Sequence, residues 1–151
     1  NMAGHNCFLV LNTDDKVNNV NNQAQFNIPD NFFTSDVEWL DMHLVSIYRA
    51  APTNTNYSTN LTQITARGLN TLNGYSTSTS DIVFEMMDME TNTYDMQFPN
   101  TRNIETVRNF SGQTISINCV NAVTDVPIVD DSDADIPRLI YVFSVQGRND
   151  L

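Results

Sequence analysis

The chain has 151 residues, of which 40% are hydrophobic, and its formal net charge is −11. This length corresponds to one domain spanning residues 1–151, and the apolar content is too high for a disordered chain. Its seven basic residues are scattered singly and no apolar run approaches the length of a membrane span, so we expect neither direct nucleic-acid binding nor a transmembrane segment.

Nine segments of the chain are predicted to be β-strands. Val, Ile, Thr and aromatic residues favour strands, and Asn, Gly, Pro and Asp mark the turns between them. In chain order the predicted strands are 7–11, 25–28, 37–49, 61–67, 81–89, 94–98, 104–110, 114–120 and 137–146. Short strands at this spacing, without crossover helices between them, predict an all-β sandwich or barrel.

The segment 37–49 is the one place where a helix competes with a strand. Val37, Leu40, Leu44 and Tyr48 fit one face of a helix. The segment is nevertheless rich in residues that favour strands, and the elements around it are predicted to be β. We therefore expect a strand.

Alternation along two late segments predicts which faces are buried. In TISINCV (114–120) the apolar residues alternate with Ser116 and Asn118, a pattern typical of a sheet with one face in water. RLIYVFSV (138–145) is more continuously apolar and predicts a strand covered on both faces.

The two cysteines, Cys7 and Cys119, both fall in predicted strands. Buried free cysteine behaves as a small hydrophobic residue, so we expect two reduced thiols in the core. The alternative is a disulfide that joins the first strand to a late one, and spacing in the sequence does not decide between the two.

Candidate catalytic groups are few. Of the two histidines, His5 lies close to the start of the sequence and His43 faces away from its apolar neighbours, and neither comes with a pattern that signals a nucleophile and an orienting partner. Glu38 and Asp41 flank the single tryptophan, Trp39, which is compatible with the paired carboxylates of a glycosidase. Acidic residues on the wet face of a strand are the favoured interpretation, and we expect no enzymatic activity.

A short acidic segment is the one candidate metal site. It contains Asp130, Asp131, Asp133 and Asp135. Ca²⁺ binds carboxylate oxygens in flexible loops, although this segment lacks the glycine and the closing glutamate of an EF-hand. A solvated acidic turn is the favoured interpretation, a calcium site is the alternative, and no other cofactor is expected.

Three Asn-x-Ser/Thr sequons occur, at Asn56, Asn60 and Asn109. In a chain this rich in Asn, Ser and Thr such matches arise by chance, so they give no functional assignment.

The order of the first apolar segments carries a family resemblance. FLVLN (8–12), FNIP (26–29) and WLDMHLVSIY (39–48) follow one another, with an asparagine-rich loop between the first two. This order resembles the start of the single jelly-roll penton or minor capsid proteins of tailless icosahedral double-stranded DNA viruses, the virophage and polinton-like group. The late segment 117–145 is similar to the closing strands of the same family.

The resemblance implies an all-β fold, a single jelly-roll β-sandwich of about eight antiparallel strands. It implies a structural protein of the virion, a penton-vertex or minor capsid subunit that self-associates, as a homopentamer, and contacts other capsid proteins. Heterologous contacts close such a ring by cyclic symmetry. An acidic chain fits this role, because packaging nucleic acid requires a basic segment.

A binding module is the alternative function. A carbohydrate- or receptor-binding β-sandwich, such as a fibre head or a lectin-like module, would present aromatic residues on a loop or sheet face. Trp39, Tyr57, Tyr75 and Tyr94 are the candidates, with calcium at the acidic segment.

Overall fold

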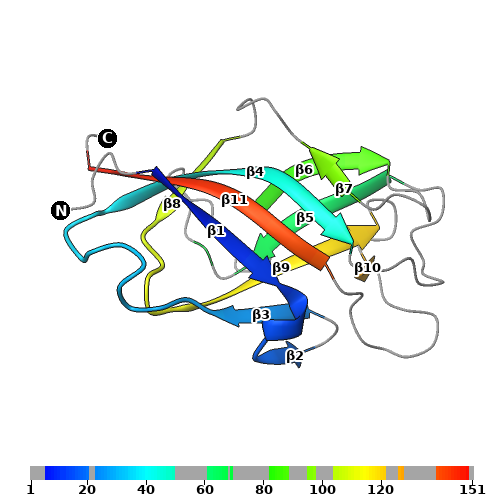
Figure 1. The fold of residues 1–151 in the computed structure, drawn as a ribbon, viewed down its shortest axis with the longest axis horizontal. Helices are drawn as coiled ribbons and strands as arrows, with labels where there is room; N and C mark the ends of the chain where they lie inside the picture. Colours follow the sequence, from blue (N-terminus) through cyan, green and yellow to red (C-terminus); the bar gives the residue numbers. More distant parts are fainter. Residues whose placement is uncertain are drawn as a thin grey trace.

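Two antiparallel β-sheets face each other across one hydrophobic core, which confirms the predicted all-β sandwich (Figure 1). The arrangement is that of a computed structural model. The structure describes residues 6–20, 23–49, 61–67, 69, 82–88, 95–97, 104–121, 126–127 and 139–149.

The first sheet has β11 at its centre. Its order is β1–β11–β4–β7, and β8 pairs with another part of β4. The strands of this sheet are β1 (Asn6–Asn12), β4 (Trp39–Arg49), β7 (Asp95–Gln97), β8 (Glu105–Arg108) and β11 (Leu139–Arg148).

The second sheet is built around β9. Its order is β2–β3–β9–β5–β6, and β10 pairs with the end of β9. The strands of this sheet are β2 (Asn18–Val20), β3 (Gln23–Asn27), β5 (Leu61–Arg67), β6 (Ile82–Asp88), β9 (Thr114–Asn121) and β10 (Val126–Pro127).

The strands pair in a nested order along the chain. β1 pairs with β11, β3 with β9, β4 with β7 and β8, and β5 with β6. When β7 and β8 are counted together and the short β2 and β10 are left aside, the first of eight strands pairs with the last, the second with the seventh, and so on inward. This is the strand order of a jelly roll, in which two four-stranded sheets pack face to face.

The predicted strands agree with the observed ones to within two residues at each boundary that the structure describes. Among the described strands, the two that the sequence did not reveal are β2 and β10, which have three and two residues. Strands this short rarely show a period of two, which needs four or more residues; β7 is also three residues long, but it lies within a predicted strand of five residues.

The segment with the competing helical pattern is the strand β4, as expected. Its register with β11 shifts: Leu44 lies opposite Phe143, whereas Ser46 lies opposite Val142. The irregularity places one extra residue in β4, so Leu44 is followed by Ile47 as the next apolar core residue, and Ser46 beside it is buried as well. Because the apolar core positions change from even to odd residue numbers along β4, their spacing in the sequence resembles that of a helical face.

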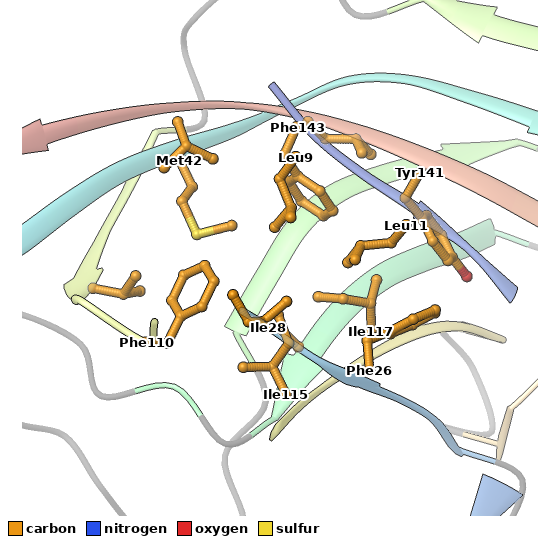
Figure 2. Packing of buried hydrophobic residues seen from close by; sticks show 14 of the residues in the cluster. Leu9, Leu11, Phe26, Ile28, Met42, Phe110, Ile115, Ile117, Tyr141 and Phe143 are labelled. Atoms are coloured by element: carbon orange, nitrogen blue, oxygen red, sulfur yellow. The ribbon is translucent and has the colours of Figure 1, made fainter. Parts of the chain in front are cut away.

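Alternation along β11 supplies much of the core. Leu139, Tyr141, Phe143 and Val145 are all fully buried. The side chains between them are half-buried, so the expectation of a strand covered on both faces was wrong for the outer face. Figure 2 shows two of these residues with those that meet them in the core: Leu9, Leu11, Phe26, Ile28, Met42, Phe110, Ile115 and Ile117.

The expectation of a wet face on β9 was also wrong. Ser116 and Asn118 are buried, with 5% and 2% exposure. The Asn118 Oδ1 accepts a hydrogen bond from the Ala24 backbone N (3.0 Å), and the Ser116 hydroxyl donates to the Ala24 carbonyl (3.1 Å). The β3–β9 register ends at Gln25, so these side chains continue the pairing where the backbone ladder stops.

A short 3-10 turn, η1 (Thr13–Asp15), follows β1. The Asn12 side chain caps it by accepting from the Asp14 backbone N (3.0 Å), and the buried Thr13 hydroxyl accepts from the Leu139 backbone N (2.9 Å). The second bond joins the end of β1 to the start of β11. Within the described ranges, no helix has the length and apolar character needed to cross a membrane.

Candidate functional site

One asparagine side chain joins two loops at one end of the sandwich. The Asn109 Nδ2 donates to the carbonyls of Thr34 (3.0 Å) and Val37 (2.9 Å), and its Oδ1 accepts from the backbone N (3.1 Å) and the hydroxyl (2.7 Å) of Ser111. We call these four residues the Asn109 clamp. Both donors and both lone pairs of the amide are used. The sequon at this position therefore contains a structural asparagine, whose amide nitrogen is already engaged in the folded chain.

Neighbouring contacts hold the same two loops together. The Phe33 backbone N donates to the Ser111 hydroxyl (2.8 Å), and the rings of Phe33 and Phe110 are buried beneath the clamp. Gly112 follows with φ +77°, the left-handed region that favours glycine. A side chain at this position would also meet the Asp30 carboxylate, so the turn requires glycine for two reasons.

An open polar cleft of about 530 Å³ borders the clamp. Its charged lining residues are Asp30, Asp36, Glu38 and Arg108. A hydrogen bond from the Thr34 hydroxyl lowers the pKa of Asp36, because it favours the charged carboxylate. The cleft is thus acidic, with one guanidinium that is already paired with Glu38.

Trp39 lies on the outer face of β4, directly opposite Arg108 of β8. The Arg108 guanidinium carbon lies 4.7 Å from the centre of the indole ring, within the range of a cation–π contact. The same guanidinium donates to the Glu38 carboxylate at 3.3 Å. Arg108 therefore occupies one face of the indole, the surface on which a sugar ring would stack.

Asp41 is held by two partners on neighbouring strands. The Thr106 hydroxyl of β8 donates to its Oδ1 at 2.6 Å, and the Arg148 Nη1 of β11 donates to its Oδ2 at 3.1 Å. Asp41 and Glu38, the two carboxylates that flank the tryptophan, are thus each held by their own arginine. These partners make both carboxylates part of a cross-strand network on the outer face of the first sheet.

Replacing Asp41 by alanine should lower the free energy of unfolding by about 1–2 kcal/mol, because it removes two charge-assisted hydrogen bonds from a partly buried site. Glu38→Ala is the matched control, since it breaks an exposed ion pair whose removal costs at most about 0.5 kcal/mol. Urea unfolding of both variants measures the difference. Equal losses would contradict the assignment of Asp41 as the structural member of the pair.

His43 also lies on the outer face of β4. Its neighbours Met42 and Leu44 point into the core, with 0% and 1% exposure, as the alternation predicted. Partial burial lowers the pKa of His43, because desolvation disfavours the imidazolium. The side chain lies on the outer surface of the first sheet, and Ser144 is its cross-strand neighbour.

This pKa predicts a dependence of stability on pH. The pKa of His43 is about 6.5 in the unfolded chain and lower in the folded chain. Above about pH 6.5 the imidazole is neutral in both states and does not reduce the free energy of unfolding. As the pH falls below this value, the unfolded chain takes up the proton first, and the free energy of unfolding decreases. Burial raises the pKa of Glu105, which acts in the opposite direction at lower pH. Urea midpoints between about pH 7.5 and about pH 5.5 should therefore fall less in His43→Gln than in the unmodified chain. An identical profile in the two proteins would refute the role of His43.

Exposed apolar side chains gather on the outer face of the first sheet. Phe8 and Val10 of β1 are 67% and 58% exposed, and Tyr48 of β4 is 41% exposed. Half-buried Val142 lies opposite Val10, and half-buried Ile140 lies opposite Tyr48. We call these five residues the outer apolar face. Contiguous apolar surface of this kind commonly marks an interaction site.

The two cysteines lie in different sheets, Cys7 in β1 and Cys119 in β9, and both are reduced thiols. Two thiols were expected in the core: Cys119 is buried there, whereas Cys7 is half-buried and packs against its edge. Partial burial raises the pKa of Cys7, so its thiol stays protonated and weakly nucleophilic at neutral pH.

The remaining predicted site residues lie outside the described residues, and their roles stay predictions. They are Asp130, Asp131, Asp133 and Asp135 of the calcium segment, the aromatic candidates Tyr57, Tyr75 and Tyr94, and His5, Asn56 and Asn60. Within the ranges that the structure does describe, no three His, Cys, Asp or Glu side chains are grouped so as to hold a metal ion.

The geometry thus contains a structural clamp, an acidic cleft and an outer apolar face, and of these the apolar face is the one suited to binding another macromolecule. Comparisons of the chain with models of protein families, with curated proteins and with solved structures found no match.

Proposed function

We propose that this protein is a structural subunit of a virus shell, a penton-vertex or minor capsid protein of an icosahedral virion. In this role it assembles into a homopentamer and contacts other capsid proteins, without binding nucleic acid and without catalysis. The resemblance of segments 8–12, 26–29 and 39–48 to such proteins supports this proposal. The nested strand order also supports it, because viral capsid domains are among the proteins built on jelly rolls.

The observation that carries the proposal is the outer apolar face. A subunit whose surfaces are buried by neighbours in a shell can expose apolar side chains as an isolated chain, because assembly covers them. Phe8 at 67% exposure and Tyr48 at 41% are large side chains of the kind that form the centres of protein interfaces. Of the four aromatic candidates for the carbohydrate-binding alternative, Trp39 is the one within the described residues, and Arg108 occupies one face of its ring.

Size-exclusion chromatography with light scattering tests the proposal. We expect the 17.0 kDa chain to elute as a pentamer of about 85 kDa. Tyr48→Ser should shift the population toward monomer, because it removes apolar area from the outer face. Val17→Ser is the matched control: Val17 is 53% exposed but lies outside the outer apolar face, so this variant should assemble normally. A chain that stays monomeric at high concentration would overturn the proposal.

A further inference from the structure

Within the described residues, β1 is an edge strand that lacks the usual protection. In the part of the chain that the structure describes, β11 is the one strand with which β1 pairs, and their register runs from Asn6 to Asn12 without a shift. Natural edge strands are commonly blocked by a charged side chain, a proline or a bulge. The sequence of β1, NCFLVLN, contains neither a charged residue nor a proline, and its ladder has no bulge. The backbone N–H and C=O groups of β1 that point away from β11 can therefore pair with another strand.

A groove runs beside this edge. It has a volume of about 340 Å³, small among ligand sites and suited to a few side chains. Leu9 and Leu11, the inward residues of β1, are 7% and 6% exposed and form one wall. The opposite wall comes from the end of β3 and the residues that follow it, and is made by Phe26, Ile28, Pro29 and Phe32.

We propose that an extended segment of another polypeptide adds to β1 as an antiparallel strand. Alternate side chains of this segment are apolar and fill the groove, while the side chains between them lie beside Phe8 and Val10 on the outer face. Main-chain hydrogen bonds to β1 supply affinity, and the groove selects the apolar positions.

The groove favours a separate segment over the β1 edge of a second copy. In a second copy Leu9 and Leu11 are committed to that copy's own core, so edge-to-edge pairing of two β1 strands leaves both grooves unfilled. A segment that is not part of a folded sheet has both rows of side chains available.

The negative charge at one end of the groove favours a basic residue at the matching end of the added segment. The exposed Asp15 lines the groove beyond the end of β1, on a chain with a net charge of −11. An antiparallel strand begins at this end, so the segment carries Lys or Arg near its N-terminus. The inference depends on β1 and its groove alone and not on the proposed shell role, because a monomer would bind such a segment equally well.

The test uses the full chain and a synthetic peptide with N-terminal Lys followed by alternating Val or Ile and Thr. Binding is measured by fluorescence anisotropy and by amide hydrogen exchange. We expect alternate amides of β1, those not bonded to β11, to exchange at least tenfold more slowly with the peptide bound. Two peptides are compared, one N-methylated at the odd-numbered amides and one at the even-numbered amides. One of them should not bind and the other should bind normally, because only the amides along one edge of the peptide pair with β1.

Variants of the chain localise the site. Val10→Lys places a charge on the exposed edge and should weaken binding at least tenfold. Ile104→Lys is the matched control, since Ile104 is 47% exposed but precedes β8, which pairs with β4 and not with β1 or β11, and binding should not change. Asp15→Asn should weaken binding about two- to fivefold and reduce its salt dependence.

Three outcomes would overturn the inference. They are failure of the alternating peptide to bind, equal binding of both N-methylated peptides, and protection of β1 amides by increasing concentration of the chain alone. The last outcome would assign the edge to a second copy. A monomeric chain that binds the peptide would refute the proposed shell role while supporting this inference, so the two can fail separately.

Discussion

Replacing Phe143 by alanine is expected to lower the free energy of unfolding by about 3–5 kcal/mol. Phe143 lies in the central strand β11, opposite Leu9 of β1 and Leu44 of β4, and is fully buried. Truncation removes a large apolar side chain and leaves a cavity among neighbours that two sheets hold in place. Domains of this size are stable by only about 5–15 kcal/mol, so the loss is a large share of the total.

Phe8→Ala provides the matched control. Phe8 lies on the neighbouring strand, opposite Ser144, and is 67% exposed. Its truncation should change the free energy of unfolding by about 0.5 kcal/mol or less, as for most surface substitutions. Urea unfolding with unchanged slopes gives both values. A larger loss for Phe8 than for Phe143 would contradict the assignment of Phe143 to the core and of Phe8 to the outer face of the first sheet.

Replacing Asn109 by alanine should cost about 2–4 kcal/mol, because the change removes four hydrogen bonds at a partly buried junction. The carbonyls of Thr34 and Val37 and both donors of Ser111 lose their partner together. Asn109→Asp should be similarly costly despite its equal shape. A carboxylate keeps the bonds from Ser111 but places negative charge against two carbonyl oxygens where the amide donates.

Asn27→Ala is the control for the clamp. The Asn27 side chain accepts one hydrogen bond from the Thr114 hydroxyl (2.7 Å) at an exposed position, so its removal should cost about 0.5 kcal/mol or less. Urea midpoints compare the three variants. If Asn109→Asp were as stable as the unmodified chain, the bonds to the two carbonyls would not contribute, and the clamp would be reduced to its contact with Ser111.

Much of the fold was predictable because the residues within a segment are enough to identify it as a strand. β-branched and aromatic residues, alternation and turn residues located every strand of four or more residues. Two faces were predicted wrongly for one shared reason: alternation describes a single strand, whereas burial depends on what lies against it. Ser116 and Asn118 are buried because they bond to Ala24, which is more than ninety residues away in the chain.

The candidate site was less predictable. Trp39, Glu38 and Asp41 were identified by residue type, but their partners Arg108 and Arg148 are distant in sequence. Asn109 was noticed as a sequon, and its structural role became visible only when the loop that carries Thr34 and Val37 lay beside it. The exposure of Phe8 and Val10 could not be inferred, because the same FLVLN pattern also suits a strand buried on both faces.

By itself the sequence determined the all-β class, the positions of the strands of four or more residues and the shared face of Met42 and Leu44, because these follow from local propensity and a period of two. Only the tertiary structure decided the nested pairing, the irregularity opposite Phe143, the Asn109 clamp and the unprotected edge of β1. Each of these depends on contacts between residues far apart in the chain, and such contacts leave no periodic trace in either segment alone.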